Sequence, residues 1–533
     1  TLDGEVEVTT VFELLKEESE NYKPETASEI TGVSAKVIEQ TAKIFADADP
    51  GMIYAGYASC KWLHGDLLQR AMLLLLALTG STGKEGGGLQ VANSPNARGL
   101  TQFGFSDIGP AFRLISSTTW DYDHADMKEL NQKIYGNDLA EKFDRYYKKS
   151  IEEDWFPDYS KNGWKMGIFA GNNGANWRAT GSTWRKTAFE ELETIVSLAP
   201  DMGVTSLYSD YVLPIAHHYE RNDLMLQSRV PYLQVLNEAV PPLGEAVDDW
   251  EANRRLAEAI SRRAKERNIK PIQDAVDGRT VRRDYTKTLE LYTMGGRVNN
   301  SKDVSQFIIN ASHGIPKISF EELSQKGIVK VDGVENTMWE KDESPYHNEI
   351  VKSVKKKLPY ETFTGRQQFY IDHEWFIEFG ETLPTFKEPL KIDEFPLRMM
   401  MGHARHGIHS TWRDDSFLLS LQRGEPDIYV NPDDAINRGV EDGDMIRIYN
   451  SAGEFFAMAH VSSGIQPGML FMYHGWDPKM FKGGKNFSEV IPTGGLIKPT
   501  SMAGDYGHLG YQPLAFAPNQ TYKDFTCDFE KSA

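Results

Sequence analysis

The chain has 533 residues, of which 40% are hydrophobic and 25% are charged, as in an ordinary water-soluble globular protein. Because one core rarely serves more than about 300 residues, this length predicts three or four domains. The formal net charge of −19 argues against a nucleic-acid partner, and the two cysteines, Cys60 and Cys527, exclude a disulfide scaffold and any four-cysteine metal site within the chain. The chain starts at Thr1 without an initiator Met or an apolar signal segment.

The first part of the chain predicts a helix, a strand and a second helix. Residues 35–45 place apolar side chains on one helical face, residues 51–56 form a short apolar run that ends in glycine, and residues 66–78 form an apolar helix. Its apolar run is far shorter than the about 20 residues that span a membrane, so we expect a buried helix. Glycine-rich residues 83–88 follow, either as a simple flexible turn or as a loop close to a ligand.

The middle of the chain predicts a parallel sheet. Residues 115–162 are polar, aromatic and irregular, which is typical of an insertion. After them, apolar runs at residues 165–170, 194–198 and 211–215 read as strands of a β-α-β series, which requires a parallel sheet, and the first of them is expected to be buried. A charged helix over residues 249–266 closes this unit.

The last part of the chain predicts a β-barrel. Residues 270–395 show mixed short elements, and within them residues 364–372 are predicted to form an exposed edge strand. From residue 397 short apolar runs alternate with turn sequences, a spacing that indicates a compact barrel of about 140 residues. The expected strands are residues 397–401, 427–430, 444–449, 454–459 and 469–473.

Two groups of polar residues follow the strands of the predicted sheet. Gly171-Asn172-Asn173 ends the first strand, where backbone N–H groups at the carboxyl edge of a parallel sheet commonly meet a dinucleotide. A plain strand-to-helix turn is the alternative, and the chain has no complete Gly-x-Gly-x-x-Gly motif for an ordinary NAD site. His217-His218 and Glu220 follow the third strand, either as ligand groups or as hydrogen-bonded edge residues.

A histidine-rich loop follows the first barrel strand. Its sequence is Gly402-His403-Ala404-Arg405-His406-Gly407-Ile408-His409-Ser410. Histidines three residues apart suit metal ligation on a helix, but Gly402 and Gly407 disfavour a regular helix. The alternatives are a loop whose imidazole and guanidinium groups face an anionic or nitrogen-rich ligand, and solvated or structural histidines. A second glycine-rich segment, residues 498–511, is either a barrel turn or a loop moulded around a ligand.

Taken in order, these segments resemble the dimethyl sulfoxide reductase superfamily of molybdopterin oxidoreductases. The similarity is strongest to its type II branch, which contains nitrate, selenate and (per)chlorate reductases, dimethyl sulfide dehydrogenase and ethylbenzene dehydrogenase. The markers cover almost the whole chain, and the ordered set is far more specific than any single one. They are residues 78–88, Asn96-Ala97-Arg98-Gly99, residues 107–109 and 206–214, Pro242-Leu243-Gly244-Glu245, residues 403–412, Arg423-Gly424-Glu425-Pro426 and residues 498–511.

The resemblance implies an α/β fold, with a parallel-sheet Rossmann-like domain and a C-terminal double-psi-type β-barrel. Residues 1–115 and 163–270 would form two parts of the α/β cofactor-binding domain, separated by an insertion at residues 116–162. Residues 271–395 would connect this domain to the barrel of residues 396–533, which would bind molybdopterin dinucleotide.

The resemblance also implies a molybdenum bis(molybdopterin guanine dinucleotide) cofactor. His403 and His409 match histidines that contact the pterin rings in the nitrate reductase branch, and no residue of this chain is expected to bind a metal. Where relatives commonly carry an Asp after the second strand this chain has Ala199-Pro200, with Asp201 close by. No catalytic residue is assigned. The expected cofactor-binding residues are Gly171, Asn172, Asn173, Asp201, Gly402, His403, Arg405, Gly407, His409, Ser410, Thr411, Lys498, Tyr506 and His508.

The family's N-terminal portion has no counterpart in this sequence. That portion carries the 4Fe–4S cluster motif, another α/β domain and the Asp that ligates molybdenum. We therefore expect the chain to be part of a catalytic subunit and to be inactive alone. The 4Fe–4S cluster is expected only in the missing part, and an iron–sulfur electron-transfer subunit is the expected partner, with a haem subunit as a further candidate. The expected location is either face of the cytoplasmic membrane, preferably the periplasmic one.

The expected activity is two-electron chemistry at molybdenum, by oxygen transfer or water-dependent hydroxylation of a small molecule. Residues 364–372, 473–478 and 515–520 favour the ethylbenzene dehydrogenase side of the branch. The alternatives are an oxyanion reductase for nitrate, selenate or chlorate, and a non-catalytic structural or electron-transfer subunit of the same fold. A histidine-ligated metal hydrolase is the third alternative, and retention of the whole histidine-rich loop argues against an empty, non-catalytic pocket.

Overall fold

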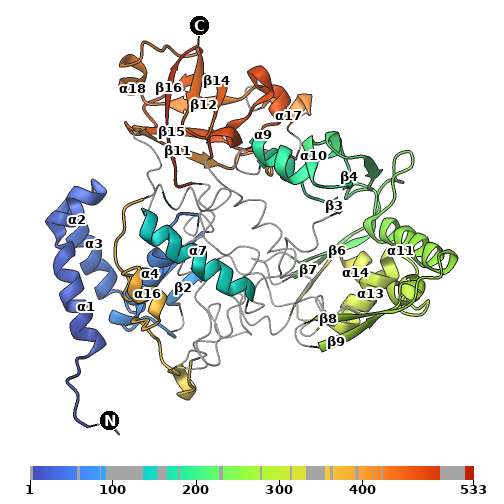
Figure 1. The fold of residues 1–533 in the computed structure, drawn as a ribbon, viewed down its shortest axis with the longest axis horizontal. Helices are drawn as coiled ribbons and strands as arrows, with labels where there is room; N and C mark the ends of the chain where they lie inside the picture. Colours follow the sequence, from blue (N-terminus) through green and yellow to red (C-terminus); the bar gives the residue numbers. More distant parts are fainter. Residues whose placement is uncertain are drawn as a thin grey trace.

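The computed structural model places N-terminal helices at one side of the molecule, an α/β unit at the other and a β-barrel at the top of the view (Figure 1). Among the described residues, no helix has both the length and the apolar character that crossing a membrane requires. The structure describes residues 4–56, 61–84, 86–91, 132, 136–152, 165–177, 181–226, 232–276, 279–312, 315–331, 354–360, 364–389, 395–411, 413, 415–421, 424–491 and 523–532.

The N-terminal part contains the predicted helix, strand and helix, and each is confirmed. Strand β1 pairs in parallel with β2, a strand that the sequence did not indicate. A short 3-10 turn, η1, links the first two helices. The elements are α1 (Val11–Ser19), η1 (Glu20–Tyr22), α2 (Pro24–Thr31), α3 (Ala35–Asp47), β1 (Met52–Ala55), α4 (Gly65–Leu78) and β2 (Gly88–Val91).

The glycine-rich loop between α4 and β2 is a tight structural turn. A Cβ atom on Gly87 would lie 2.7 Å from both the Cβ of Pro50 and the carbonyl oxygen of Ser81. The amide of Gly51 also donates to the hydroxyl of Ser81 at 2.9 Å. Glycine is therefore needed here because the backbone approaches another loop.

The predicted parallel sheet is present, with the order β3-β4-β5. One face packs on a cluster that includes Ala175, Phe189 and Val204, and the other packs against helix α11 through Ala252. Strand β3 was expected to be buried, and this expectation is wrong: β3 lies at the sheet edge, where Met166 is 52% exposed. The bounds are β3 (Met166–Ala170), β4 (Thr194–Ala199), β5 (Tyr211–Pro214) and α11 (Asp249–Glu266).

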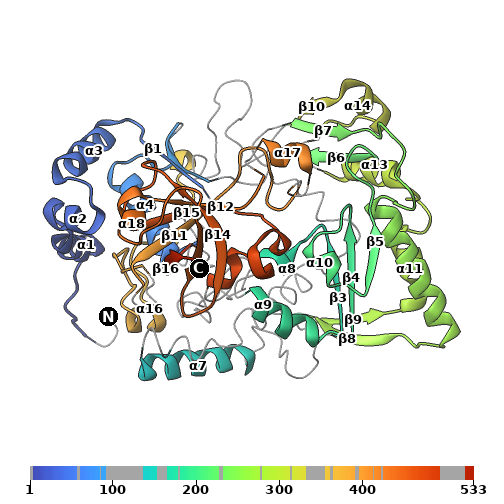
Figure 2. The same cartoon turned by 90° about the horizontal axis from the view of Figure 1, so that it is seen from above.

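Short helices connect these strands and a second set of strands follows them. Seen from above, α8, α9 and α10 lie beside the barrel, between it and β4 (Figure 2). The connecting elements are α8 (Gly174–Trp177), α9 (Gly181–Trp184), the π-helical turn η4 (Arg185–Phe189) and α10 (Val204–Leu207). Strands β6 (Asp223–Leu226), β7 (Tyr232–Leu236) and β10 (Ile328–Lys330) form an antiparallel sheet, and β8 (Ile272–Val276) and β9 (Arg279–Arg283) form a hairpin. The neighbouring helices are η5 (Tyr285–Lys287), α12 (Thr288–Tyr292), α13 (Ser301–Ala311) and α14 (Phe320–Lys326).

Two segments that were expected to be irregular or a strand differ from that expectation, while the prediction of an insertion stays untested. Residues 115–162 lie mostly outside the described residues, but they include helix α7 (Asn137–Glu152), whose polar composition hid its helical spacing. Residues 364–372 form a turn and a segment without regular secondary structure, followed by α16 (Glu374–Glu378). The segment needs no strand partner because the Arg70 guanidinium binds the carbonyl of Phe369 at 3.3 Å and Ile371 donates to Thr382.

The C-terminal part forms a closed barrel of order β11-β15-β12-β14-β13-β16. The five predicted strands are confirmed, whereas β16, which closes the barrel between β13 and β11, was not predicted. Side chains such as Ile428, Phe455 and Phe529 fill its interior. The strands are β11 (Leu397–Gly402), β12 (Asp427–Val430), β13 (Met445–Tyr449), β14 (Glu454–Val461), β15 (Met469–Tyr473) and β16 (Thr526–Lys531). The helical turns are α17 (Ser416–Ser420), α18 (Pro432–Ile436), η6 (Pro478–Met480), η7 (Lys482–Gly484) and η8 (Phe487–Val490).

Closure of the barrel by β16 can be tested with paired substitutions on that strand. Phe529→Ala empties a site that is only 2% exposed, and we expect it to lower the free energy of unfolding by about 3–5 kcal/mol. Glu530→Ala, on the outer side of the same strand, should cost less than about 1 kcal/mol, because its ion pair with Arg447 is exposed. Urea unfolding followed by hydrogen exchange of the barrel amides measures both. Equal effects would contradict this closure.

Candidate functional site

The histidine-rich loop meets the turn after β15 because β11 and β15 run side by side in parallel. Gly402, the last residue of β11, is the register partner of Tyr473, the last residue of β15. The two connections therefore leave the barrel at the same end. The backbone amide of His474 donates to the carbonyl of Gly402 at 3.0 Å, which places His474 beside the loop.

Three histidine rings gather at this point. The ring centroids of His403 and His474 lie 4.5 Å apart, those of His403 and His409 4.8 Å, and those of His409 and His474 5.1 Å. Nδ1 of His409 lies 3.0 Å from Nε2 of His474. The loop is not helical, as predicted from its glycines. The sequence pattern grouped His406 with His403 and His409, but in the structure the third histidine of the group is His474.

Close packing holds the two loops together. Gly475 has φ +97°, and a Cβ atom there would collide with the carbonyl oxygen of His409. Arg413 is buried; its guanidinium stacks over the Trp476 ring at 4.4 Å and donates to the carbonyl of His474 at 2.6 Å. His409 itself has φ +53°, an uncommon conformation for a residue with a side chain. Its backbone is therefore held in place by its neighbours.

A side-chain bridge joins this loop to the carboxyl edge of the parallel sheet. The amide nitrogen of Asn173 donates to the hydroxyl of Ser410 at 3.1 Å. The amide oxygen of Asn173 accepts from the backbone nitrogen and the hydroxyl of Thr205, each at 3.0 Å. The Gly-Asn loop and the histidine-rich loop, which are far apart in sequence, are thus brought together.

The other predicted site residues lie along the same two edges. Gly171, with φ +58°, and Asn172 are exposed at the end of β3, and Asp201 is exposed after β4. The charge of Asp201 acts on His217, which follows β5 and whose amide donates to Glu220 at 2.8 Å. Arg405, Gly407 and Thr411 belong to the histidine-rich loop, where Arg405 and Thr411 are exposed. Lys498, Tyr506 and His508 lie outside the described residues.

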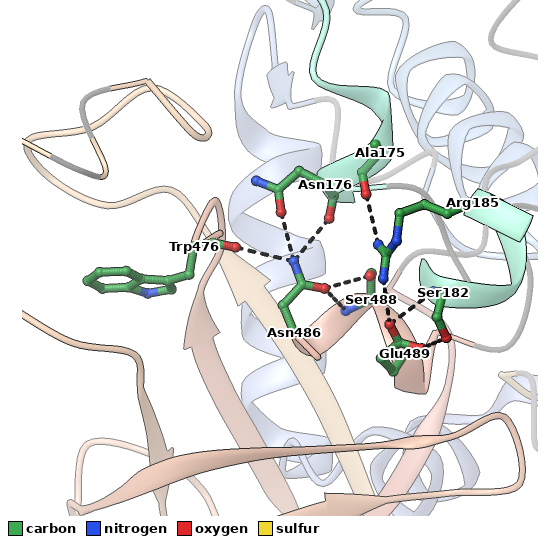
Figure 3. Close-up of polar contacts among 8 residues, drawn as sticks. All are labelled: Ala175, Asn176, Ser182, Arg185, Trp476, Asn486, Ser488 and Glu489. Atoms are coloured by element: carbon green, nitrogen blue, oxygen red, sulfur yellow. Dashed lines mark hydrogen bonds and ion pairs between the residues drawn. The ribbon is translucent and has the colours of Figure 1, made fainter. Parts of the chain in front are cut away.

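A buried network around Asn486 fixes the barrel against the helices that follow β3 (Figure 3). The amide nitrogen of Asn486, a fully buried side chain, donates to the carbonyl and the side-chain oxygen of Asn176 at 3.0 and 2.7 Å. It also lies 3.2 Å from the carbonyl of Trp476, within the turn that carries His474. A single amide therefore contacts both the α/β unit and the turn beside the histidine-rich loop.

The same network contains a buried ion pair. Glu489 accepts hydrogen bonds from the backbone nitrogen and the hydroxyl of Ser182 at 2.9 and 2.7 Å, and from Arg185 at 3.3 Å. Arg185 also donates to the carbonyl of Ala175 at 3.0 Å (Figure 3). Because both charges are satisfied, this buried pair can orient the barrel relative to the sheet.

The three histidines are neutral near pH 7. Burial lowers the pKa of His474 to about 4, although the hydrogen bond to the carbonyl of Gly402 acts in the opposite direction. Burial likewise lowers the pKa of His403, assisted by Lys523 and Lys61, and that of His409, assisted by His403 and Lys61. The Lys523 ammonium is itself held close by a hydrogen bond of 3.0 Å to the carbonyl of Met401. Neutral imidazoles beside ammonium groups suit an anionic or nitrogen-rich ligand.

Ligation of a metal ion is geometrically conceivable here but electrostatically unfavourable. His403, His409 and His474 each offer a ligand atom, and these atoms lie within 4.8 Å of one another. However, the ammonium groups of Lys61 and Lys523 act on the ring of His403, and Lys61 also acts on that of His409, so they would repel a further cation. Contact of these histidines with a ligand rather than with a metal therefore stays a prediction.

The sequence pattern missed several residues of this site. These residues come from four separate segments: His474, Arg413, Lys61 and Lys523. The pairing of β11 with β15 and the hydrogen bond from the amide of Lys523 to the carbonyl of Lys61 bring them together. Only one feature of the sequence pointed to His474. His474-Gly475 follows a predicted strand, and polar residues at the ends of adjacent strands are candidates for a common site.

Comparison with known proteins places the chain in a family. Residues 10–259 match the family model described as "Molybdopterin oxidoreductase", and residues 397–505 match the "Molydopterin dinucleotide binding domain". The chain belongs to the molybdopterin oxidoreductase family. The second match contains the histidine-rich loop and His474. The family resemblance and the α/β fold with a closed barrel are thereby confirmed.

Several subunits of this molybdopterin oxidoreductase family are similar along almost the whole chain. The perchlorate reductase subunit alpha of Dechloromonas aromatica is 33% identical over 99% of the chain and 57% of the relative. The respiratory nitrate reductase subunit alpha of Haloferax mediterranei is 32% identical over 100% of the chain and 56% of the relative. The dimethylsulfide dehydrogenase subunit alpha of Rhodovulum sulfidophilum is 31% identical over 99% of the chain and 58% of the relative. The chain thus spans little more than half the length of these relatives.

A solved structure supports the fold of this molybdopterin oxidoreductase family member independently. Acetylene hydratase from Pelobacter acetylenicus superposes with a TM-score of 0.62 and 17% identity, over 98% of this chain and 66% of that one. At this identity the likeness concerns the fold alone.

The buried ion pair can be tested by neutralising one partner. Glu489→Gln leaves the Arg185 guanidinium uncompensated where both side chains are 7% exposed, and we expect a loss of about 3–5 kcal/mol of stability. Glu454→Gln is the matched control, because its pair with Arg447 is about one third exposed and should be worth less than about 1 kcal/mol. Chemical denaturation measures both variants; a small loss for Glu489→Gln would show that the pair does not join the two units.

The low pKa of His474 predicts a pH-dependent stability. Its pKa of about 4 in the folded chain lies below the ordinary 6.5, so between these values the unfolded chain takes up a proton first. Stability is therefore full above pH 6.5 and is lost as the pH falls towards 4, by up to about 3 kcal/mol. Urea unfolding at several pH values should show this loss in the wild type and a smaller one in His474→Phe, which cannot titrate. An identical pH dependence in the two would exclude this origin.

Proposed function

We propose that the chain is the cofactor-clasping part of the catalytic subunit of a molybdenum bis(molybdopterin guanine dinucleotide) oxidoreductase. The observation that carries this proposal is the neutral histidine cluster joined to the sheet edge through Asn173 and Ser410. The cluster lies within the segment that matches a dinucleotide-binding domain, and the sheet edge lies within the segment that matches the oxidoreductase.

The residues at this junction fit such a cofactor. His403 and His409 would contact the pterin through ring nitrogens that are not charged near pH 7. Gly171 and Asn172 lie exposed at the carboxyl edge of the parallel sheet, which suits a dinucleotide pyrophosphate. Lys61 and Lys523 supply positive charge in a chain of net charge −19. The remaining expected contacts are Asp201, Gly402, Arg405, Gly407, Thr411, Lys498, Tyr506 and His508.

The proposed reaction is two-electron oxygen transfer with a small-molecule substrate. The bound molybdenum supplies this chemistry, while the protein holds and orients the cofactor. The similar relatives are named for reduction of perchlorate or nitrate and for oxidation of dimethylsulfide. Oxyanion reduction and water-dependent oxidation, including hydroxylation of an ethylbenzene-like hydrocarbon, are therefore the two directions to assay.

The relatives also suggest the assembly. Each is named as a subunit alpha, so we propose that this chain works with other subunits. An iron–sulfur electron-transfer subunit is the proposed main partner, with a haem subunit as a further one, and a 4Fe–4S cluster would be bound by a part of the protein beyond these residues. We propose the periplasmic face of the membrane as the location.

Cofactor content of the purified full-length gene product tests the proposal. We expect molybdenum and guanine nucleotide in the wild type. His403→Gln and His409→Gln should lower both by about five-fold, which corresponds to about 1 kcal/mol per lost hydrogen bond. His406→Gln is the matched control, since His406 is exposed on the same loop but stands apart from the histidine cluster. Zinc without molybdenum in the wild type would instead support a hydrolase, and no metal would support a non-catalytic subunit.

A further inference from the structure

A short chain of hydrogen bonds runs from the barrel backbone through two histidine rings. Nδ1 of His474 lies 2.5 Å from the carbonyl oxygen of Gly402. Nε2 of His474 lies 3.0 Å from Nδ1 of His409. A carbonyl oxygen can only accept, so Nδ1 of His474 carries the proton and donates it to Gly402.

The protonation of the second ring follows from the first. His474 is neutral near pH 7, because burial lowers its pKa to about 4. With its one proton on Nδ1, its Nε2 is a lone pair that accepts a hydrogen bond. The donor must then be Nδ1–H of His409. His409 is neutral as well, since burial lowers its pKa, so its Nε2 is unprotonated.

We propose that His474 is a positioning residue that fixes the tautomer of His409, so that Nε2 of His409 accepts a hydrogen bond from a ring N–H group of the cofactor. The inference rests on the proposed function for the identity of that ligand. A reduced pterin ring carries N–H groups, which an acceptor nitrogen would recognise and a second N–H would repel. In this arrangement His409 orients a ring and donates no proton near neutral pH.

Backbone contacts hold the rings of His409 and His474 at hydrogen-bonding distance from each other. Gly475 lets the carbonyl of His409 approach so closely that any side chain there would collide with it. Arg413 holds the carbonyl of His474 at 2.6 Å. The main chains of both residues are therefore held in place. Because Nδ1 of His409 is bound to His474, Nε2 of His409 is the nitrogen that remains available to a ligand.

Nitrogen-15 NMR of the histidine-labelled full-length gene product reads the tautomers directly, with signals assigned by single substitutions. We expect His409 to be protonated on Nδ1 and not on Nε2 in the wild type. In His474→Phe, which keeps a ring of similar size without nitrogen, the proton should move to Nε2. In His474→Gln, whose side-chain oxygen can accept in place of Nε2, it should stay on Nδ1. His460→Gln, in a histidine of β14 that contacts Asp442, is the control and should change nothing.

The same variants link the tautomer to the ligand. His474→Phe should lower the molybdenum and guanine nucleotide content about five-fold, and His474→Gln should restore most of it. A wild-type His409 protonated on Nε2, or one whose Nε2 shows the nitrogen-15 shift of a metal-bound ring, would overturn the inference whatever the molybdenum content. A wild type that lacks molybdenum but shows the expected tautomer would overturn the proposed function instead. Because the wild-type spectrum decides the central point, a variant that fails to fold leaves the test intact.

Discussion

The site depends on the parallel pairing of β11 with β15. The register that aligns Gly402 with Tyr473 makes two connections leave the barrel side by side. The carbonyl of Gly402 can then accept from both the backbone amide and the ring Nδ1 of His474. A one-residue shift would turn the side chains of β15 to the other face of the sheet and separate the rings. The barrel core, with Leu470 and Met472 fully buried, opposes such a shift.

The second requirement is a stiff junction between the barrel and the parallel sheet. Each of them carries only one side of the proposed cofactor site, and contacts between them set their relative position. Asn486 and the Arg185–Glu489 pair supply directional contacts between the barrel and the α/β unit. Apolar packing alone would fix the relative position of the two less strictly, because it has no direction. The Asn173–Ser410 hydrogen bond does the same for the Gly-Asn loop and the histidine-rich loop. Polar groups buried in this way specify geometry more than they add stability.

The strands and long helices could be predicted because their signals are local. Helix α11 begins and ends where its charged sequence indicated, and the barrel strands are short, mostly apolar runs whose side chains alternate between buried and more exposed positions. Strand β16 was missed since Thr526–Lys531 carries charges on its outer face and lies far from the other strands in sequence. Residues 364–372 had a strand-like composition, but the Arg70 guanidinium binds the backbone there. A long-range side chain thus outweighed a local preference.

The sequence alone determined the family, the parallel sheet and the barrel, and it predicted the two loops that the structure brings together. It also excluded a regular helix for the histidine-rich loop, because two glycines interrupt it. Only the tertiary structure decided which histidines gather: His474 joins His403 and His409, while His406 stays apart. It also decided the protonation state, because burial and the acceptor at Gly402 act across 72 residues. The spacing of residues along the chain indicates which side chains are neighbours within one helix or strand. Ring contacts, burial and hydrogen-bond direction depend instead on which strands pair.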